Sequence, residues 1–108
     1  KADLTLESDV IEMMEAITTH FGGVDILVNN AGISLNAMSW KMSLVDWQKS
    51  LDTNLTTAFL CTKHSLPYMR KNEWGRIIHV SSVVAQTGVA GASAYAASKS
   101  ALFGFTKS

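Results

Sequence analysis

Apolar residues recur with the period of a helix in the N-terminal part of the chain. The positions that share this face are Val10, Met13, Met14 and Ile17. Thr5 precedes the pattern and is a suitable N-cap, whereas Gly22 and Gly23 follow it and favour a helix end. We therefore predict a helix over residues 6–20.

Two short apolar runs follow turn residues and are typical of strands. Residues 24–29 come directly after the glycine pair that ends the helix, and residues 76–81 come directly after a turn at Trp74 and Gly75. Continuous apolar runs of this length are common in parallel sheets whose two faces are both covered. We expect two buried, parallel strands at these positions.

Helical patterns separate and follow the two predicted strands. A capping-box pattern begins at Ser43, a longer helix is expected over residues 52–70, and an alanine-rich helix is expected over residues 94–107. Residues 83–93 are small and glycine-rich, which predicts a loop. Helices that alternate with strands in this way imply parallel strands joined by right-handed crossovers, so the predicted fold class is α/β.

The two predicted strands end in polar or small residues. Residues 29–32 close the first strand, and Ser81 and Ser82 close the second. In open α/β sheets, ligands bind outside the carboxyl ends of the strands. Both strand ends therefore point to one functional crevice.

Composition narrows the possible classes of protein. Nine Lys and Arg residues balance nine Asp and Glu residues, and no basic stripe indicates binding to nucleic acid or to an anionic membrane surface. No apolar run reaches the ~18 residues of a membrane span. Cys61 is the only cysteine, so an internal disulfide is impossible, which fits a reducing, cytoplasmic environment.

The strongest chemical signal is a tyrosine followed four residues later by a lysine, at Tyr95 and Lys99. On a helix, this spacing puts the phenol and the ammonium on one face, one turn apart. A nearby cation favours the phenolate, which lets a tyrosine exchange its proton near neutral pH. Taken alone, the same pair also fits a solvated lysine beside a packed tyrosine.

Ser82 and Asn54 are weaker candidates when each is considered alone. A hydroxyl at the end of the second strand is able to donate to a substrate carbonyl, but it is equally able to cap backbone groups. Asparagine is a poor helix former, so the side chain or the carbonyl of Asn54 is a candidate ligand for a buried water. The alternative for Asn54 is an ordinary exposed polar position.

Taken together, these residues resemble the short-chain dehydrogenase/reductase family. The sequence D-I-L-V-N-N-A-G at residues 25–32, Asn54, Ser82, and the Y-x-x-x-K pair at Tyr95 and Lys99 occur in the order and spacing of that family. The resemblance extends over essentially the whole chain and is greatest to bacterial 3-oxoacyl-(acyl-carrier-protein) reductases. It implies a Rossmann-like, doubly wound parallel sheet, of which these residues would form the central and catalytic part.

The resemblance implies catalytic roles for four residues. Tyr95 would be the general acid/base, and Lys99 would favour its ionised form and bond the ribose of the nicotinamide. Ser82 would orient and polarise the carbonyl, and Asn54 would hold a water that links Lys99 to solvent. The implied activity is hydride transfer between NAD or NADP and a small-molecule carbonyl or alcohol substrate.

The resemblance also implies cofactor-binding residues, which are Asp3, Leu4, Asn30, Ala31, Gly32, Tyr95 and Lys99, with Asn29 supporting the strand. No histidine, cysteine and carboxylate spacing predicts a metal site. The family's glycine-rich turn for the pyrophosphate is not found in residues 1–108. We expect these residues to be part of a single domain, without its N-terminal cofactor turn and its C-terminal substrate segment.

Several properties remain open at this level. The rival substrates are small alcohols, sugars and steroids, and a rival of another class is a non-catalytic fragment used only in assembly. Residues 1–108 alone are expected to be inactive. A homodimer or homotetramer is expected through the helix at 52–70 and the helix at 94–107, because the first carries more apolar residues than one buried stripe requires.

Overall fold

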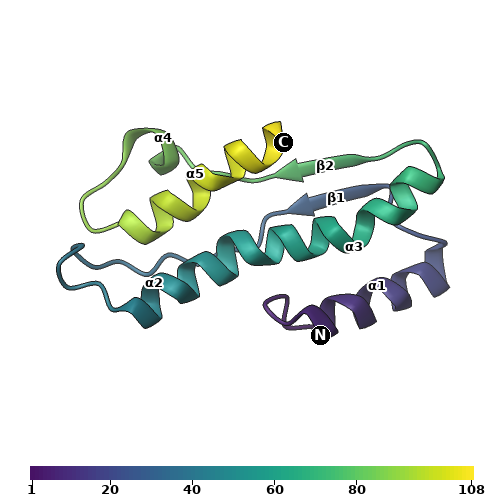
Figure 1. The fold of residues 1–108 in the computed structure, drawn as a ribbon, viewed down its shortest axis with the longest axis horizontal. Helices are drawn as coiled ribbons and strands as arrows, with labels where there is room; N and C mark the ends of the chain where they lie inside the picture. Colours follow the sequence, from purple (N-terminus) through teal and green to yellow (C-terminus); the bar gives the residue numbers. More distant parts are fainter.

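The computed structural model describes all residues 1–108 and has a parallel pair of strands covered by helices (Figure 1). The elements are, in order, α1 (Glu7–Phe21), β1 (Ile26–Asn29), α2 (Leu44–Leu51), the π-helix η1 (Asp52–Thr56), α3 (Thr57–Lys71), β2 (Arg76–His79), α4 (Val84–Thr87) and α5 (Ser93–Lys107). The α/β fold class is therefore confirmed. None of the helices combines the length and the apolar character that crossing a bilayer requires.

The strands run parallel in a register that pairs Ile26 with Arg76 and Asn29 with His79. Both strands point toward the end of the molecule where α2, α4 and α5 gather, as Figure 1 shows. The carboxyl ends of both strands therefore lie at one end of the sheet, and Val80, directly after β2, contacts Lys99 of α5.

Helix α1 packs on α3 through the face that the sequence predicted. Val10 and Met14 are buried together with Leu60 and Cys61 of α3. The helix ends at Gly22, whose left-handed backbone (φ 83°) lets its N–H reach Thr18 O. The predicted N-cap at Thr5 is wrong, because Leu6 occupies that position without a capping side chain, and the Thr5 hydroxyl donates to Asp3 instead.

Helices α2 and α3 form one continuous helix, although the sequence predicted two. Ser43 caps the start, where its hydroxyl oxygen accepts from the N–H of Asp46. The two parts join through η1, in which the N–H of Thr57 donates to the carbonyl of Asp52, five residues earlier. Such π segments are rare overall, and those that occur are often found at functional sites.

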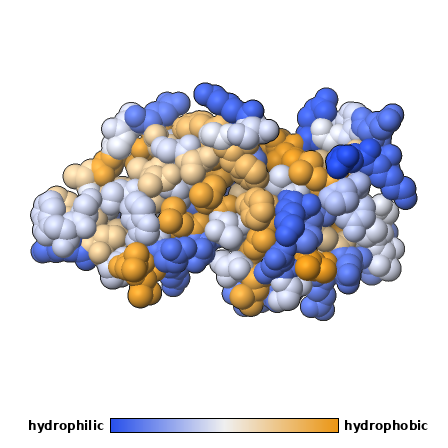
Figure 2. Space-filling view, in the orientation of Figure 1, coloured by the Kyte–Doolittle hydropathy of each residue, from blue (hydrophilic) through white to orange (hydrophobic).

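The prediction of fully buried strands is wrong for one face of the sheet. Asn29 lies on the covered face, and its amide donates to Thr62 of α3. The opposite face carries Ile26 and Val28 of β1 and Ile78 of β2, which are 56%, 54% and 50% exposed. The reason is that the helices of residues 1–108 cover one face only. Figure 2 shows apolar side chains at the surface across the middle of the face in view.

The segment predicted as a loop at residues 83–93 contains the short helix α4. Its start is favoured by Ser82, whose hydroxyl oxygen accepts from the N–H of Val84 at 3.2 Å. Gly88 ends the helix at a φ of 65°, a conformation that favours glycine. Ser100 of α5 then donates to the carbonyl of Ala85, which fixes α4 against α5.

Ser50 is fully buried in α2, and its hydroxyl has no hydrogen-bond partner in the chain. An unpaired buried hydroxyl destabilises the folded state, so Ser50→Ala is expected to raise the free energy of unfolding by about 1 kcal/mol. Urea unfolding measures this change. Ser65→Ala is the matched control, because Ser65 is equally buried but donates to Thr62 O, and this variant is expected to lose stability. A loss of stability in Ser50→Ala would contradict the prediction.

Candidate active site

Lys99 lies inside the molecule at the junction of α5 and β2. Its side chain is almost fully buried, and Nζ donates to the carbonyl of Val80 at 2.8 Å, directly after β2. The backbone carbonyl of Lys99 accepts from the hydroxyl of Ser81 at 2.8 Å. Because burying an ammonium is unfavourable unless it is hydrogen-bonded, these contacts fix where the amine sits.

Asn54 lies in the π segment and is also buried. Its Oδ1 accepts from the N–H of Ile33 at 2.7 Å, and its Nδ2 donates to Ile33 O at 2.9 Å and to Ser98 Oγ at 2.9 Å. The alternative of an exposed polar position is therefore wrong. The sequence predicted that this side chain is diverted from the helix. It bonds the backbone of Ile33, in the segment that follows β1, and the hydroxyl of Ser98 on α5.

Gly32 completes a cluster with Asn54 and Lys99 at the carboxyl end of β1. A β-carbon added at Gly32 would lie 3.0 Å from Asn54 Oδ1 and 3.2 Å from Lys99 Nζ. Both distances are close to contact limits, so only a residue without a side chain fits there without displacing one of the two groups. The structure thus brings together three of the residues that the sequence singled out.

Tyr95 and Ser82 lie at the same end of the sheet, without a direct bond to this cluster. Tyr95 is in the first turn of α5, one turn before Lys99, and is half-buried. Its backbone carbonyl accepts from Ser98, while no hydrogen bond involves its hydroxyl. Ser82 follows β2 and is engaged at the start of α4. Both hydroxyl oxygens therefore retain the capacity to bond a substrate.

The remaining candidate cofactor residues divide between two places. Leu4, Asn30 and Ala31 line a cavity of about 270 Å³ beside β1, together with Asn29. Asp3 is exposed outside this cavity. Its carboxylate accepts from the hydroxyl and the N–H of Thr5, and these hydrogen bonds hold the pKa of Asp3 below its ordinary value.

Sequence reasoning missed Ser98 as part of the site. It stands between Tyr95 and Lys99, and its position inside the Y-x-x-x-K pair was the available signal. It is fully buried and connects Asn54 to the carbonyl of Tyr95. The ring of His79 accepts a hydrogen bond from the Asn29 amide and lies 5.0 Å from the ring of Phe105.

The arrangement has the groups that proton transfer to a carbonyl oxygen requires. A phenol and a buried ammonium lie one turn apart on α5, and a serine hydroxyl follows the neighbouring strand. Hydroxyl donors of this kind stabilise charge that develops on oxygen. No group of three histidine, cysteine or carboxylate side chains in the chain is placed to hold a metal ion.

Comparison of the sequence with known proteins identifies its relatives. The family model for short chain dehydrogenases matches residues 1–108. A 3-oxoacyl-(acyl-carrier-protein) reductase of Aquifex aeolicus (strain VF5) is 46% identical over 106 residues, which are 98% of this chain and 43% of that protein. A reductase of the same name from Vibrio cholerae is 45% identical over 106 residues, with 98% and 43% covered.

A third relative bears the name of a different activity. The D-beta-hydroxybutyrate dehydrogenase of Cupriavidus necator is 42% identical over 106 residues, which are 98% of this chain and 41% of that protein. The chain therefore spans less than half the length of the curated relatives it matches.

Proposed function

We propose a function from one established premise, which is that this chain belongs to the short-chain dehydrogenase family. We propose that the protein is an NAD(P)-dependent oxidoreductase that interconverts a carbonyl and an alcohol. The observation that carries the proposal is the convergence of Lys99, Asn54 and Gly32 at the carboxyl ends of two parallel strands, with Tyr95 one turn before Lys99.

Residues 1–108 are proposed to be part of a single domain whose other segments supply the pyrophosphate-binding turn and the rest of the substrate site. The longer relatives and the half-exposed apolar face of the sheet support this view. We also propose a cytoplasmic location, which fits the single, buried cysteine.

In the proposed reaction, the phenol of Tyr95 gives a proton to the carbonyl oxygen of the substrate, or takes it back from the alcohol. Lys99, one helical turn along α5, is proposed to supply a positive charge near the reacting oxygen. The Ser82 hydroxyl donates to the same oxygen and orients the carbonyl. Asn54 is proposed to hold the water that connects Lys99 to solvent, through a backbone group, because its side chain is already engaged.

The residues present fit part of a nicotinamide dinucleotide. Gly32 lies beside the amine of Lys99, which would bond a ribose hydroxyl. Leu4, Asn30 and Ala31 border the cavity beside β1 and would line the adenosine side, with Asp3 as an acceptor. When bound, the cofactor supplies or accepts the hydride. Neither NAD nor NADP is favoured by the residues of this chain.

Gly32→Ala tests the close approach at this cluster. The added β-carbon is expected to displace the Lys99 amine, because Asn54 is held by three hydrogen bonds and Lys99 has a flexible side chain. We expect kcat/KM to fall about tenfold, since small misplacements of catalytic groups are costly. Steady-state kinetics measures this value, and urea unfolding on the same sample should show little loss of stability. Unchanged kcat/KM would contradict the prediction.

The favoured substrate is a 3-oxoacyl thioester, because the first relatives bear that name. A second candidate is a free 3-hydroxy acid such as β-hydroxybutyrate, favoured by the Cupriavidus relative. Small alcohols, sugars and steroids are the wider alternative. Both favoured candidates carry the reacting oxygen on the third carbon of an acyl chain.

The test is an absorbance assay of nicotinamide oxidation or reduction by the full-length protein. Acetoacetyl-coenzyme A would be paired with NADPH and with NADH, and β-hydroxybutyrate with NADP and with NAD. Turnover of the thioester at least tenfold faster than of the free acid supports the first candidate, and the reverse supports the second. Absence of turnover with every pair, while cofactor binding is also absent by calorimetry, would favour the non-catalytic alternative. Residues 1–108 alone are expected to bind neither cofactor.

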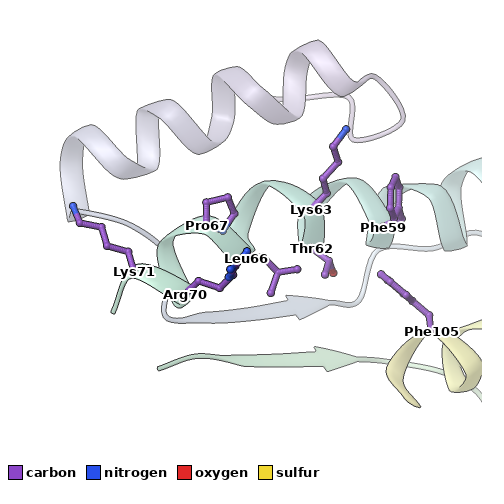
Figure 3. Close-up of a pocket in the computed structure, with 8 residues that line it drawn as sticks. All are labelled: Phe59, Thr62, Lys63, Leu66, Pro67, Arg70, Lys71 and Phe105. Carbon is purple, nitrogen blue, oxygen red and sulfur yellow. The ribbon is translucent and has the colours of Figure 1, made fainter. Parts of the chain in front are cut away.

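The partner proposed for the helical surface is a second copy of this chain, in a homodimer or homotetramer. A groove of about 730 Å³ runs along α3 to α5, as Figure 3 shows. Its residues are Phe59, Thr62, Lys63, Leu66, Pro67, Arg70, Lys71 and Phe105. An antiparallel pairing of α3 with its copy would bring the basic end at Arg70 and Lys71 toward Asp52 of η1, the segment that precedes α3.

Phe59→Glu is expected to convert the full-length oligomer to a monomer at micromolar concentration. Phe59 is 47% exposed within the groove, and a carboxylate there would be desolvated in the interface. Phe21→Glu is the control, because Phe21 is 82% exposed on α1, outside the groove. Sedimentation velocity measures both variants. A Phe59→Glu protein that keeps the oligomeric state of the unsubstituted protein would contradict the proposed interface.

A further inference from the structure

Ser98 is the only side chain of α5 that bonds the π segment. It is fully buried, and its Oγ accepts from Asn54 Nδ2 at 2.9 Å while its hydroxyl donates to the carbonyl of Tyr95 at 2.8 Å. The two bonds use the hydroxyl in both directions, as donor and as acceptor. Ser98 therefore connects the two segments that carry the candidate relay and the candidate acid.

The amide of Asn54 uses both of its donor hydrogens in this arrangement. Both Nδ2 hydrogens are used, one by Ile33 O and one by Ser98, and Oδ1 takes the N–H of Ile33. Ile33 directly follows Gly32, which borders the Lys99 amine. One continuous set of bonds therefore runs from the end of β1, through the π segment, to the first turn of α5.

We infer that Ser98 is a positioning residue. It holds α5 at the correct distance and rotation relative to the π segment, so that Tyr95 and Lys99 face the proposed substrate site. This inference rests on the proposed function. Ser98 does not touch the reacting atoms; it acts through Asn54 and through the backbone of Tyr95.

The alternative role for Ser98 is a purely structural bond within a helix. Thr106 provides that comparison on the same helix, because its hydroxyl donates to Leu102 O and reaches no other element. A loss caused only by the helical back-bond should therefore appear in Thr106→Val as well as in Ser98→Ala. A loss caused by the connection to Asn54 should appear in Ser98→Ala alone.

The experiment is a double-mutant cycle in the full-length protein, with the substrate and cofactor that give turnover in the assay above. Ser98→Ala is expected to lower kcat about tenfold while both KM values stay within about twofold. Its pH profile is expected to move in the same direction as that of Lys99→Met. Asn54→Ala combined with Ser98→Ala is expected to match Asn54→Ala alone within about twofold, because the two residues act through one bond.

The outcomes separate this inference from the function on which it rests. Absence of turnover in the unsubstituted protein would overturn the proposed function and the inference together. Normal turnover in Ser98→Ala would overturn the inference alone. A loss of kcat in Ser98→Ala with an unchanged pH profile would also overturn the inference. The same holds if the fold-losses of kcat in Ser98→Ala and Asn54→Ala multiply in the double variant, because either result indicates a structural role. Thr106→Val is expected to keep kcat within about twofold.

Discussion

Replacing Tyr95 by phenylalanine is expected to lower kcat of the full-length protein roughly 10²–10⁴-fold, which is the range attributed to general acid/base catalysis. The variant loses only the hydroxyl, and this hydroxyl makes no hydrogen bond within the chain, so the fold has no contact to lose. Cofactor affinity is expected to stay close to normal. Steady-state kinetics and calorimetric titration of the cofactor measure the two effects.

The chain offers a matched control in Tyr68, which is its other tyrosine and lies on α3, where its side chain packs near Gly23. Tyr68→Phe removes the same hydroxyl far from the candidate site and is expected to keep kcat within about twofold. Wild-type kcat in Tyr95→Phe with a carbonyl substrate would show that Tyr95 is not the acid.

Lys99→Met is expected to damage both catalysis and cofactor binding. Methionine retains most of the buried volume but removes the charge and the bond to Val80 O. We expect kcat to fall at least 10²-fold, because the positive charge one helical turn from Tyr95 is lost, and the cofactor KM to rise about tenfold. In the direction of alcohol oxidation, where Tyr95 is the base, any residual activity should require a higher pH than in the unsubstituted protein. A pH-rate profile and a cofactor titration measure these changes.

Lys107→Met is the control for charge, since Lys107 lies on the same helix but is exposed at its last turn. It is expected to change neither the pH profile nor the cofactor KM. If Lys99→Met also leaves both unchanged, Lys99 has no part in the mechanism.

Local periodicity was enough to predict the long helices and the two strands. The apolar positions of α1 recur every three or four residues, and Val10 and Met14 are buried where that pattern puts them. Helix α1 ends at Gly22 because the chain adopts a left-handed backbone conformation there, which favours glycine. These features depend on neighbours in the sequence, so a single sequence carries them.

Errors arose where a local signal competed with other bonds. Thr5 is a suitable N-cap by residue type, but its hydroxyl is already bonded to Asp3. The segment at 83–93 has loop-like composition, yet Ser82 favours a turn of helix at its start. Continuous apolar residues predicted buried strands, although burial depends on whether a second layer covers the sheet.

Sequence by itself determined the family, the α/β order and the spacing of Tyr95 and Lys99, because that spacing and the helix period together fix one face. Only the tertiary structure decided which groups Asn54 and Lys99 bond. The partners of Asn54 lie 21 and 44 residues away, and that of Lys99 lies 19 residues away. Such partners are chosen by how α5, the π segment and the strand ends pack, which no local pattern encodes. Ser98 belongs to the site for the same reason, because its bond to Asn54 joins residues that are 44 positions apart.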